Sequence, residues 1–126
     1  MENIDIPSTA RTPRLSLDVA SRVFLLEGES YPEDTKKFYE EPVSHVINFL
    51  SQSHDGEVVA RFKFKYFNSS SAKVLMDLCT ALESSAKAGN QVLVEWHYVS
   101  DDENMKELGE EFSEELSAAR FTLIEY

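Results

Sequence analysis

Three consecutive serines, Ser69 to Ser71, could accept phosphate, because they stand where a strand pattern passes into a helix pattern. The strand pattern ends at Tyr66-Phe67, and Asn68 directly precedes the serines. A helix start offers unpaired N–H groups and the positive end of the helix dipole, so phosphate there is stabilised while it changes the outward surface. The commoner use of an Asn/Ser cluster at such a place is to cap the helix. The segment therefore predicts either a plain cap or a phosphorylation switch.

Hydrophobic periodicity predicts the elements before this cluster. Alternation over residues 15–19, followed by an apolar run over residues 22–27, indicates a hairpin. Asp34 or Thr35 then caps a helix, and Pro42 either belongs to its first turn or kinks it. The apolar residues of that helix follow helical spacing: Tyr39, Val43, Val46, Ile47 and Leu50.

The elements around and after the cluster are equally regular. Residues 61–66 alternate between basic and aromatic side chains, which is typical of a strand with one buried face. A helix follows the serines and ends near Gly89, and residues 92–98 form the next alternating strand. Ser100 and Glu103 form a capping box for an acidic helix, and a last strand covers residues 121–126. The apolar stripes of the two helices are Leu75, Leu78, Cys79, Leu82 and Ala86, then Met105, Leu108, Phe112 and Leu116.

The order of these elements predicts an α/β fold with a mixed five-stranded sheet in one domain spanning residues 1–126, its first ten residues loosely ordered. Alternating strands have only one apolar side, so the helices should cover one face. Arg61, Lys63, Lys65, Glu95 and His97 should lie on the other. The core should contain Phe62, Phe64, Tyr66, Val92, Val94, Trp96, Leu75, Leu78 and Leu82.

Loops that follow parallel strands share one edge of a sheet, where partners usually bind. Tyr31-Pro32, Asn68-Ser69-Ser70 and residues 98–102 should therefore be neighbours. Tyr31 and Pro32 fit a rigid turn as well as a partner contact, and Asp101 and Asp102 fit a helix N-terminus better than a metal site. Lys73, one turn beyond Ser69, could offset a phosphate or pair with Asp77.

Composition narrows the class of protein. The chain of 126 residues carries a net charge of −11, which argues against a nucleic-acid partner. Residues 101–115 hold eight carboxylates and one basic residue, Lys106, either as a solvated face or as a docking surface for a basic partner.

No signal-peptide pattern or membrane-spanning run is visible, and the single cysteine, Cys79, falls on an apolar stripe, so we expect a cytoplasmic protein without membrane insertion.

Signatures of catalysis are missing. The four glycines are too scattered for a phosphate-binding loop, and Ser69 lacks the flanking glycines of a hydrolase nucleophile. His45, His54 and His97 follow no metal-ligand spacing. We therefore expect a non-enzymatic protein with no cofactor and no metal.

Several short motifs, in their order along the chain, resemble the SiaC family of bacterial regulatory phosphoproteins. They are Ser30-Tyr31-Pro32-Glu33, Asn-Ser-Ser-Ser-Ala-Lys after Tyr-Phe, Trp96-His97-Tyr98 before the acidic residues 101–103, and Leu108-Gly109-Glu110-Glu111-Phe112. The resemblance runs from about Ile6 to the C-terminus. The family is similar to anti-sigma-factor antagonists of the SpoIIAA type, so the resemblance implies a SpoIIAA-like (STAS-like) fold.

The resemblance also implies a function in partner switching. It makes Ser69 the phosphate acceptor, although such chains often have Thr there, and Ser70 and Ser71 remain alternatives. Tyr31, Pro32, Asn68, Ser70, Ser71, Lys73, Asp101 and Asp102 would contact partners. Those partners would be a SpoIIAB-like protein kinase, a PP2C-type phosphatase and an effector such as a diguanylate cyclase, which links the chain to cyclic di-GMP signalling and biofilm regulation. The alternatives are an anti-sigma-factor antagonist, a constitutive adaptor, or a small enzyme using the same edge.

Overall fold

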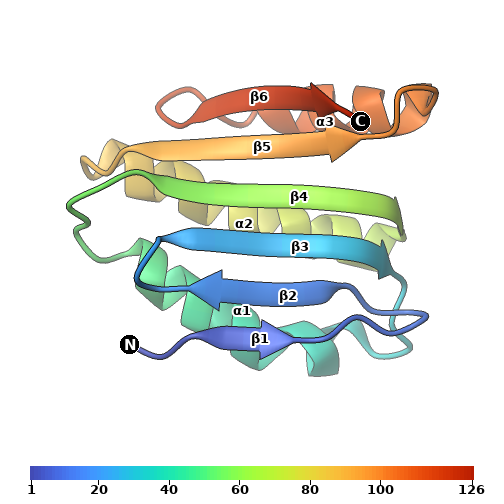
Figure 1. Cartoon of the computed structure of the whole chain (residues 1–126), viewed down its shortest axis with the longest axis horizontal. Helices are drawn as coiled ribbons and strands as arrows, with labels where there is room; N and C mark the ends of the chain where they lie inside the picture. The colour runs from blue at the N-terminus through green and yellow to red at the C-terminus, as the bar shows by residue number, and fades with distance from the viewer.

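The computed structural model describes all residues 1–126 as a mixed six-stranded sheet with three helices on one face (Figure 1). The strands are β1 (Ile4–Ile6), β2 (Arg14–Asp18), β3 (Val23–Ser30), β4 (Val58–Phe67), β5 (Val92–Tyr98) and β6 (Arg120–Glu125). The helices are α1 (Thr35–Leu50), α2 (Ser69–Lys87) and α3 (Glu103–Ser113). The strands lie side by side in sequence order, antiparallel from β1 to β3 and parallel from β3 to β6.

The sheet has six strands, not the expected five, because the N-terminal segment adds one. Strand β1 pairs with β2, with Ile4 opposite Leu17 and Ile6 opposite Leu15. Both isoleucines pack against the hydrophobic core. Residues 4–6 are therefore held by pairing with β2 and by partial packing of the two isoleucines, unlike the expected loose start.

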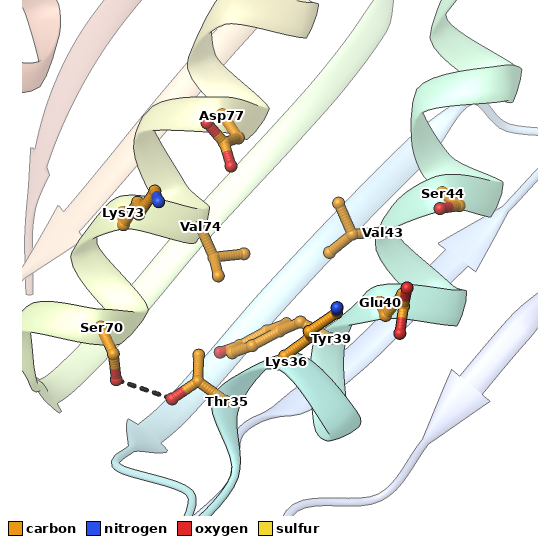
Figure 2. Close-up of a pocket in the computed structure, with 10 residues that line it drawn as sticks. All are labelled: Thr35, Lys36, Tyr39, Glu40, Val43, Ser44, Ser70, Lys73, Val74 and Asp77. Carbon is orange, nitrogen blue, oxygen red and sulfur yellow. Dashed lines mark hydrogen bonds between the residues drawn. The ribbon is translucent and has the colours of Figure 1, made fainter.

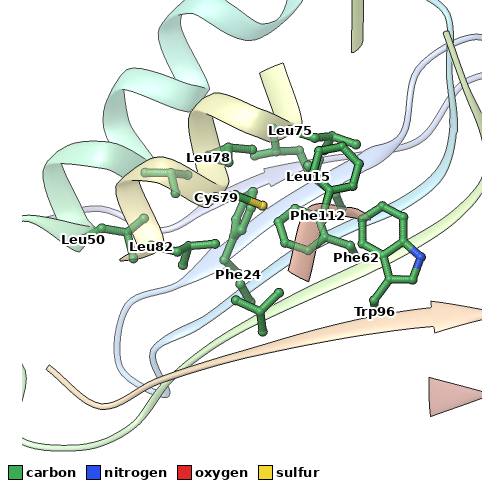
Figure 3. Close-up of a cluster of buried hydrophobic side chains, with 14 of the residues drawn as sticks. Leu15, Phe24, Leu50, Phe62, Leu75, Leu78, Cys79, Leu82, Trp96 and Phe112 are labelled. Atoms are coloured by element: carbon green, nitrogen blue, oxygen red, sulfur yellow. The ribbon is translucent and has the colours of Figure 1, made fainter. Parts of the chain in front are cut away.

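The core lies between the sheet and the helices (Figure 3). Leucines of α2 contact the aromatic residues of the central strands, and all predicted core residues except Tyr66 are buried. Full burial of such a side chain stabilises the fold by about 1.5–3 kcal/mol relative to leaving it exposed.

Tyr66 faces outward because β4 contains a bulge. Gly28 of β3 pairs with Phe64, and the next residue, Glu29, pairs with Tyr66, so Lys65 is an extra residue. The bulge inverts the alternation, which leaves Tyr66 51% exposed and buries Phe67. The prediction of Tyr66 in the core is wrong for this reason.

The helix ends confirm one expectation and correct two others. Asp34, one of the two expected caps, caps α1 by accepting the Lys37 N–H at 3.0 Å. Pro42 lies well inside that helix, so the alternative that placed it in the first turn is wrong. Asp102, instead of Ser100, caps α3 and accepts the Met105 N–H at 3.0 Å. On the apolar stripes, Phe49 is buried where Ile47 was expected, and Leu116 lies beyond the end of α3.

The opposite face of the sheet carries Arg61, Lys63, Glu95 and His97, as expected, and these side chains form ion pairs. Arg61 Nε lies 2.8 Å from a Glu95 carboxylate oxygen, and His97 Nε2 lies 3.1 Å from the same oxygen. Lys63 Nζ lies 3.6 Å from Glu27. Helices therefore cover only one face. None of the three helices combines the length and apolar character needed to span a bilayer.

Candidate functional site

The serine cluster forms the first turn of α2, and Asn68 caps it. Asn68 has an extended backbone, and its side-chain oxygen accepts the Ser71 N–H at 2.9 Å. Its own N–H donates to the Ser30 carbonyl at 3.0 Å, which holds the start of α2 against the end of β3. Because the asparagine supplies the cap, no serine hydroxyl is needed for it.

The three serines have different surroundings. Ser71 is only 1% exposed, and its hydroxyl donates to the Ser30 carbonyl at 3.1 Å. Ser70 is exposed, but its hydroxyl is bonded to Thr35 Oγ1 at 2.6 Å and to the Asn68 side chain at 3.1 Å. The Ser69 hydroxyl is exposed and has no hydrogen bond within the chain. Ser69 is thus the most accessible acceptor, and Ser71 is a structural residue that cannot contact a partner in this conformation.

A buried group of hydroxyls supports this turn from below. Ser30 Oγ lies 2.5 Å from the Tyr39 hydroxyl and 2.7 Å from Ser71 Oγ. Burial raises the pKa of Tyr39, outweighing the opposite effect of its hydrogen bonds to Ser30 and Ser71. The group joins the end of β3, the first turns of α1 and the start of α2. Together with Asn68, it holds the first turn of α2 against β3 and α1.

Two hollows flank α2, and neighbouring serines face different ones because each helical residue turns the side chain by about 100°. Ser70 faces a hollow of about 450 Å³ against α1 (Figure 2). Ser69 faces a hollow of about 460 Å³ against α3. The residues that line this second hollow are Phe67, Ser69, Ala72, Lys73, Met76, Leu108, Glu111 and Phe112. Lys73 borders both hollows.

The structure brings some of the predicted partner-binding residues together. Tyr31 lies beside Tyr66, with ring centroids 5.9 Å apart, and Pro32 follows it at the carboxyl edge of β3. Asp101 and Asp102 follow β5 at the same edge, with Asp102 serving as the α3 cap. No hydrogen bond or ion pair joins them to Ser69.

Lys73 forms no ion pair with Asp77, so the pairing suggested by the helical spacing is wrong. Its ammonium group remains free on the ridge between the two hollows. A free cation one turn from Ser69 is available to offset an anion there.

Sequence reasoning did not assign four residues to the site. Thr35, Ser30 and Tyr39 engage the neighbouring serines, and Glu111 lines the hollow that Ser69 faces. Ser30 and Glu111 belong to motifs of the family resemblance, but no local spacing shows that any of the four lies beside the serine cluster.

The remaining reactive side chains offer no cluster of metal ligands and one buried thiol. No three His, Cys, Asp or Glu side chains are arranged to hold a metal ion. Burial, with a smaller effect from Glu115, raises the pKa of Cys79 to about 12. The thiol is therefore protonated near neutral pH and weakly nucleophilic.

Comparison with known proteins shows which family this chain resembles. A model of the SiaC family regulatory phosphoprotein matches residues 6–126. An uncharacterized protein of Pseudomonas aeruginosa (strain UCBPP-PA14) is 33% identical over 119 residues, which are 93% of this chain and 92% of the relative.

Solved structures give the same result. Apo-SiaC from Pseudomonas aeruginosa is 31% identical, with a TM-score of 0.87 over 98% of this chain and 99% of that one. A similar chain, 30% identical with a TM-score of 0.90 over 98% and 99%, comes from the crystal structure of the diguanylate cyclase SiaD in complex with its activator SiaC, from the same organism. The chain therefore belongs to the SiaC family of regulatory phosphoproteins.

Proposed function

We propose that this chain is a non-enzymatic partner-switching phosphoprotein, with a fold of the SpoIIAA type, that is reversibly phosphorylated on Ser69. The observation that carries the proposal is the contrast within the serine cluster. Ser69 alone offers an exposed hydroxyl with no partner, at the first position of a helix, in a family of regulatory phosphoproteins.

The surroundings of Ser69 suit a phosphate that changes the surface without unfolding the chain. Phosphate adds about −1.5 to −2 charges at pH 7. The free N–H groups of the first turn of α2 and the ammonium group of Lys73 stabilise that charge. The carboxylate of Glu111, which lines the same hollow, does not stabilise the phosphate, because both groups are negative. The modified serine would therefore stay in place and project a hydrated dianion into the hollow.

A partner that packs on this edge would have to remove water from the dianion, which is costly. In this proposal a SpoIIAB-like kinase adds the phosphate, a PP2C-type phosphatase removes it, and the unmodified chain binds and activates a diguanylate cyclase. The similar SiaC chain seen with the cyclase SiaD supports the choice of effector. Tyr31, Pro32, Asn68, Ser70, Lys73, Asp101 and Asp102 form the proposed contact edge.

Phosphate mapping tests the acceptor. The purified chain and its Ser69→Ala and Ser70→Ala variants are incubated with ATP and the SpoIIAB-like kinase encoded nearest to this gene, then analysed by mass spectrometry. We expect one phosphate on the wild type and on Ser70→Ala, located at Ser69, and none on Ser69→Ala. Phosphate on Ser70 in the wild type would move the assignment to the α1 side of the helix.

Cyclase activation tests the switch. Ser69→Ala should bind and activate the effector cyclase whether or not the kinase is present, and the phosphorylated wild type should bind at least about tenfold more weakly, which corresponds to 1.4 kcal/mol. Ser69→Asp, with at most one negative charge, should show a smaller loss. Equal binding by the phosphorylated and unmodified chains would show that Ser69 has no regulatory role.

A further inference from the structure

We propose that the hollow between α2 and α3, beside Ser69, is the groove into which the effector inserts an apolar ridge flanked by basic residues. This inference deepens the proposed function by naming the surface and the chemistry of the partner. The groove is lined mainly by apolar side chains, from Phe67, Ala72, Met76, Leu108 and Phe112. Such a lining favours an apolar insertion.

The wall formed by α3 carries negative charge that the chain itself does not neutralise. Glu103, Glu107, Glu110 and Glu111 are all exposed, and none of the ion pairs in the chain includes a carboxylate of this helix. At 100° per residue, these carboxylates form one band that starts at Glu111 on the groove rim and continues onto the outward surface of α3. Lysine or arginine residues beside the apolar ridge would complement this band.

Other surfaces of the chain differ from this groove in lining or in position. The hollow beside β1, lined by Ile4, Ile6 and the carboxylates of Glu2 and Glu41, includes no residue of the serine cluster. The hollow between α1 and α2 has both signs of charge on its walls, from Lys36 and Lys73 on one hand and Glu40 and Asp77 on the other. On the helix-free face, the carboxylates are already paired with Arg61 and Lys63. The α2–α3 groove joins a mainly apolar lining to the unpaired carboxylates of α3, with Lys73 as the one cation in its lining, and it borders Ser69.

The position of Ser69 on the α2 rim explains how phosphate would act on this partner. An apolar ridge in the groove would pack directly against the dianion and pay for its desolvation. The basic residues of the partner would instead contact the acidic band of α3, which begins at Glu111 on the opposite rim and continues outward across a helix about 10 Å wide. Attraction to the phosphate over that distance is largely screened at physiological salt. The cost of packing the apolar ridge against the phosphate therefore outweighs the attraction between the phosphate and the basic residues of the partner.

Three synthetic helical peptides of about 18 residues, long enough to lie along α3, provide the probes. The first has a leucine face and lysine elsewhere, the second keeps the leucine face but carries glutamate, and the third has the composition of the first with its leucines scattered. Each is titrated into the isotope-labelled full chain, and backbone amide signals are followed by NMR. We expect the first peptide to shift Ala72, Met76, Leu108 and Glu111 to saturation, and the other two to bind at least about tenfold more weakly.

Two matched substitutions locate the contact. Glu111→Lys should weaken binding of the leucine-lysine peptide about threefold to tenfold, whereas Glu40→Lys, the same change on α1, should alter it less than twofold. Both positions are exposed, so neither variant should impair folding.

Three results would refute the proposal that the groove is the docking surface. They are failure of the leucine-lysine peptide to bind, equal binding of the scattered peptide, and shifts centred on Leu25 and His97 of the open face. These outcomes are independent of the phosphorylation experiments. If phosphate on Ser69 leaves cyclase binding unchanged while the peptide still maps to the groove, the switch is wrong and the docking surface stands.

Discussion

Replacement of Glu83 by glutamine probes how the connection between α3 and β6 is held. The Glu83 side chain, on the last turns of α2, accepts hydrogen bonds from the N–H groups of Ser117, Ala118 and Ala119 at 3.0–3.1 Å. It also accepts from the Ser117 hydroxyl at 2.8 Å, and the residue is only 7% exposed. One carboxylate thus anchors the turn that follows α3 and so holds the α3 wall of the groove.

These hydrogen bonds lower the pKa of Glu83 to about 2 from 4.5, chiefly through the Ala119 and Ala118 N–H groups, against the opposing effect of burial. Because the pKa is lower in the folded than in the unfolded state, the anchor stabilises the fold fully above about pH 4.5. Its contribution is lost as the pH falls from 4.5 toward 2.

Glutamine keeps one acceptor oxygen but loses the charge and turns an amide NH₂ toward the backbone donors. Hydrogen bonds to a charged group contribute about 1.5–3 kcal/mol each, so the loss of one or two gives an expected destabilisation of about 2–4 kcal/mol at pH 7. Urea unfolding at several pH values measures it. The control is Glu114→Gln, an exposed carboxylate without an ion pair, which should change stability by less than about 0.5 kcal/mol.

The gap in stability between wild type and Glu83→Gln should narrow as the pH is lowered from 5 toward 3. If the free energy of unfolding falls by less than about 0.5 kcal/mol at pH 7, the hydrogen bonds of Glu83 do not contribute measurably to stability. A gap that stays constant over this pH range would show that the carboxylate charge is not its source.

Two further substitutions test packing near the site. Gly109→Ala would place a Cβ 2.5 Å from Trp96 Cδ1, so we expect a loss of about 1–3 kcal/mol in urea unfolding and a shift in tryptophan fluorescence; unchanged stability would mean that α3 can move away from the sheet freely. Tyr39→Phe removes the hydroxyl bonded to Ser30 and should cost about 0.5–1.5 kcal/mol, with altered NMR signals at Ser71; unaltered signals there would show that the buried hydroxyls do not support the turn.

Hydrophobic alternation predicted most of the fold because β2, β4 and β5 each bury one face. It failed at Tyr66, where a bulge adds a residue that period-two reasoning cannot foresee. The short strand β1 was missed because its three residues carry little pattern of their own and are ordered by pairing with β2. At α3, the capping-box pattern predicted Ser100 as the cap, but the helix begins two residues later than that pattern implies and Asp102 caps it.

The candidate site was predictable in its position but not in its internal differences. The strand-to-helix pattern and the family motifs marked residues 68–71 directly. The burial of Ser71 and the bond between Ser70 and Thr35 depend on contacts with β3 and α1, which no local sequence shows. These long-range contacts are what distinguish Ser69 from its neighbours.

Ser69 and Ser70 lie on opposite flanks of α2, so the residue that is modified would determine which surface of the chain changes. A phosphate moved by one position along the chain would leave the apolar groove against α3 and enter the mixed-charge hollow against α1. Two adjacent hydroxyls with similar chemistry would then report to different surfaces and so to different partners. In the proposed switch, selection of Ser69 over Ser70 would therefore depend on a hydrogen bond from another helix, in which Thr35 engages the Ser70 hydroxyl.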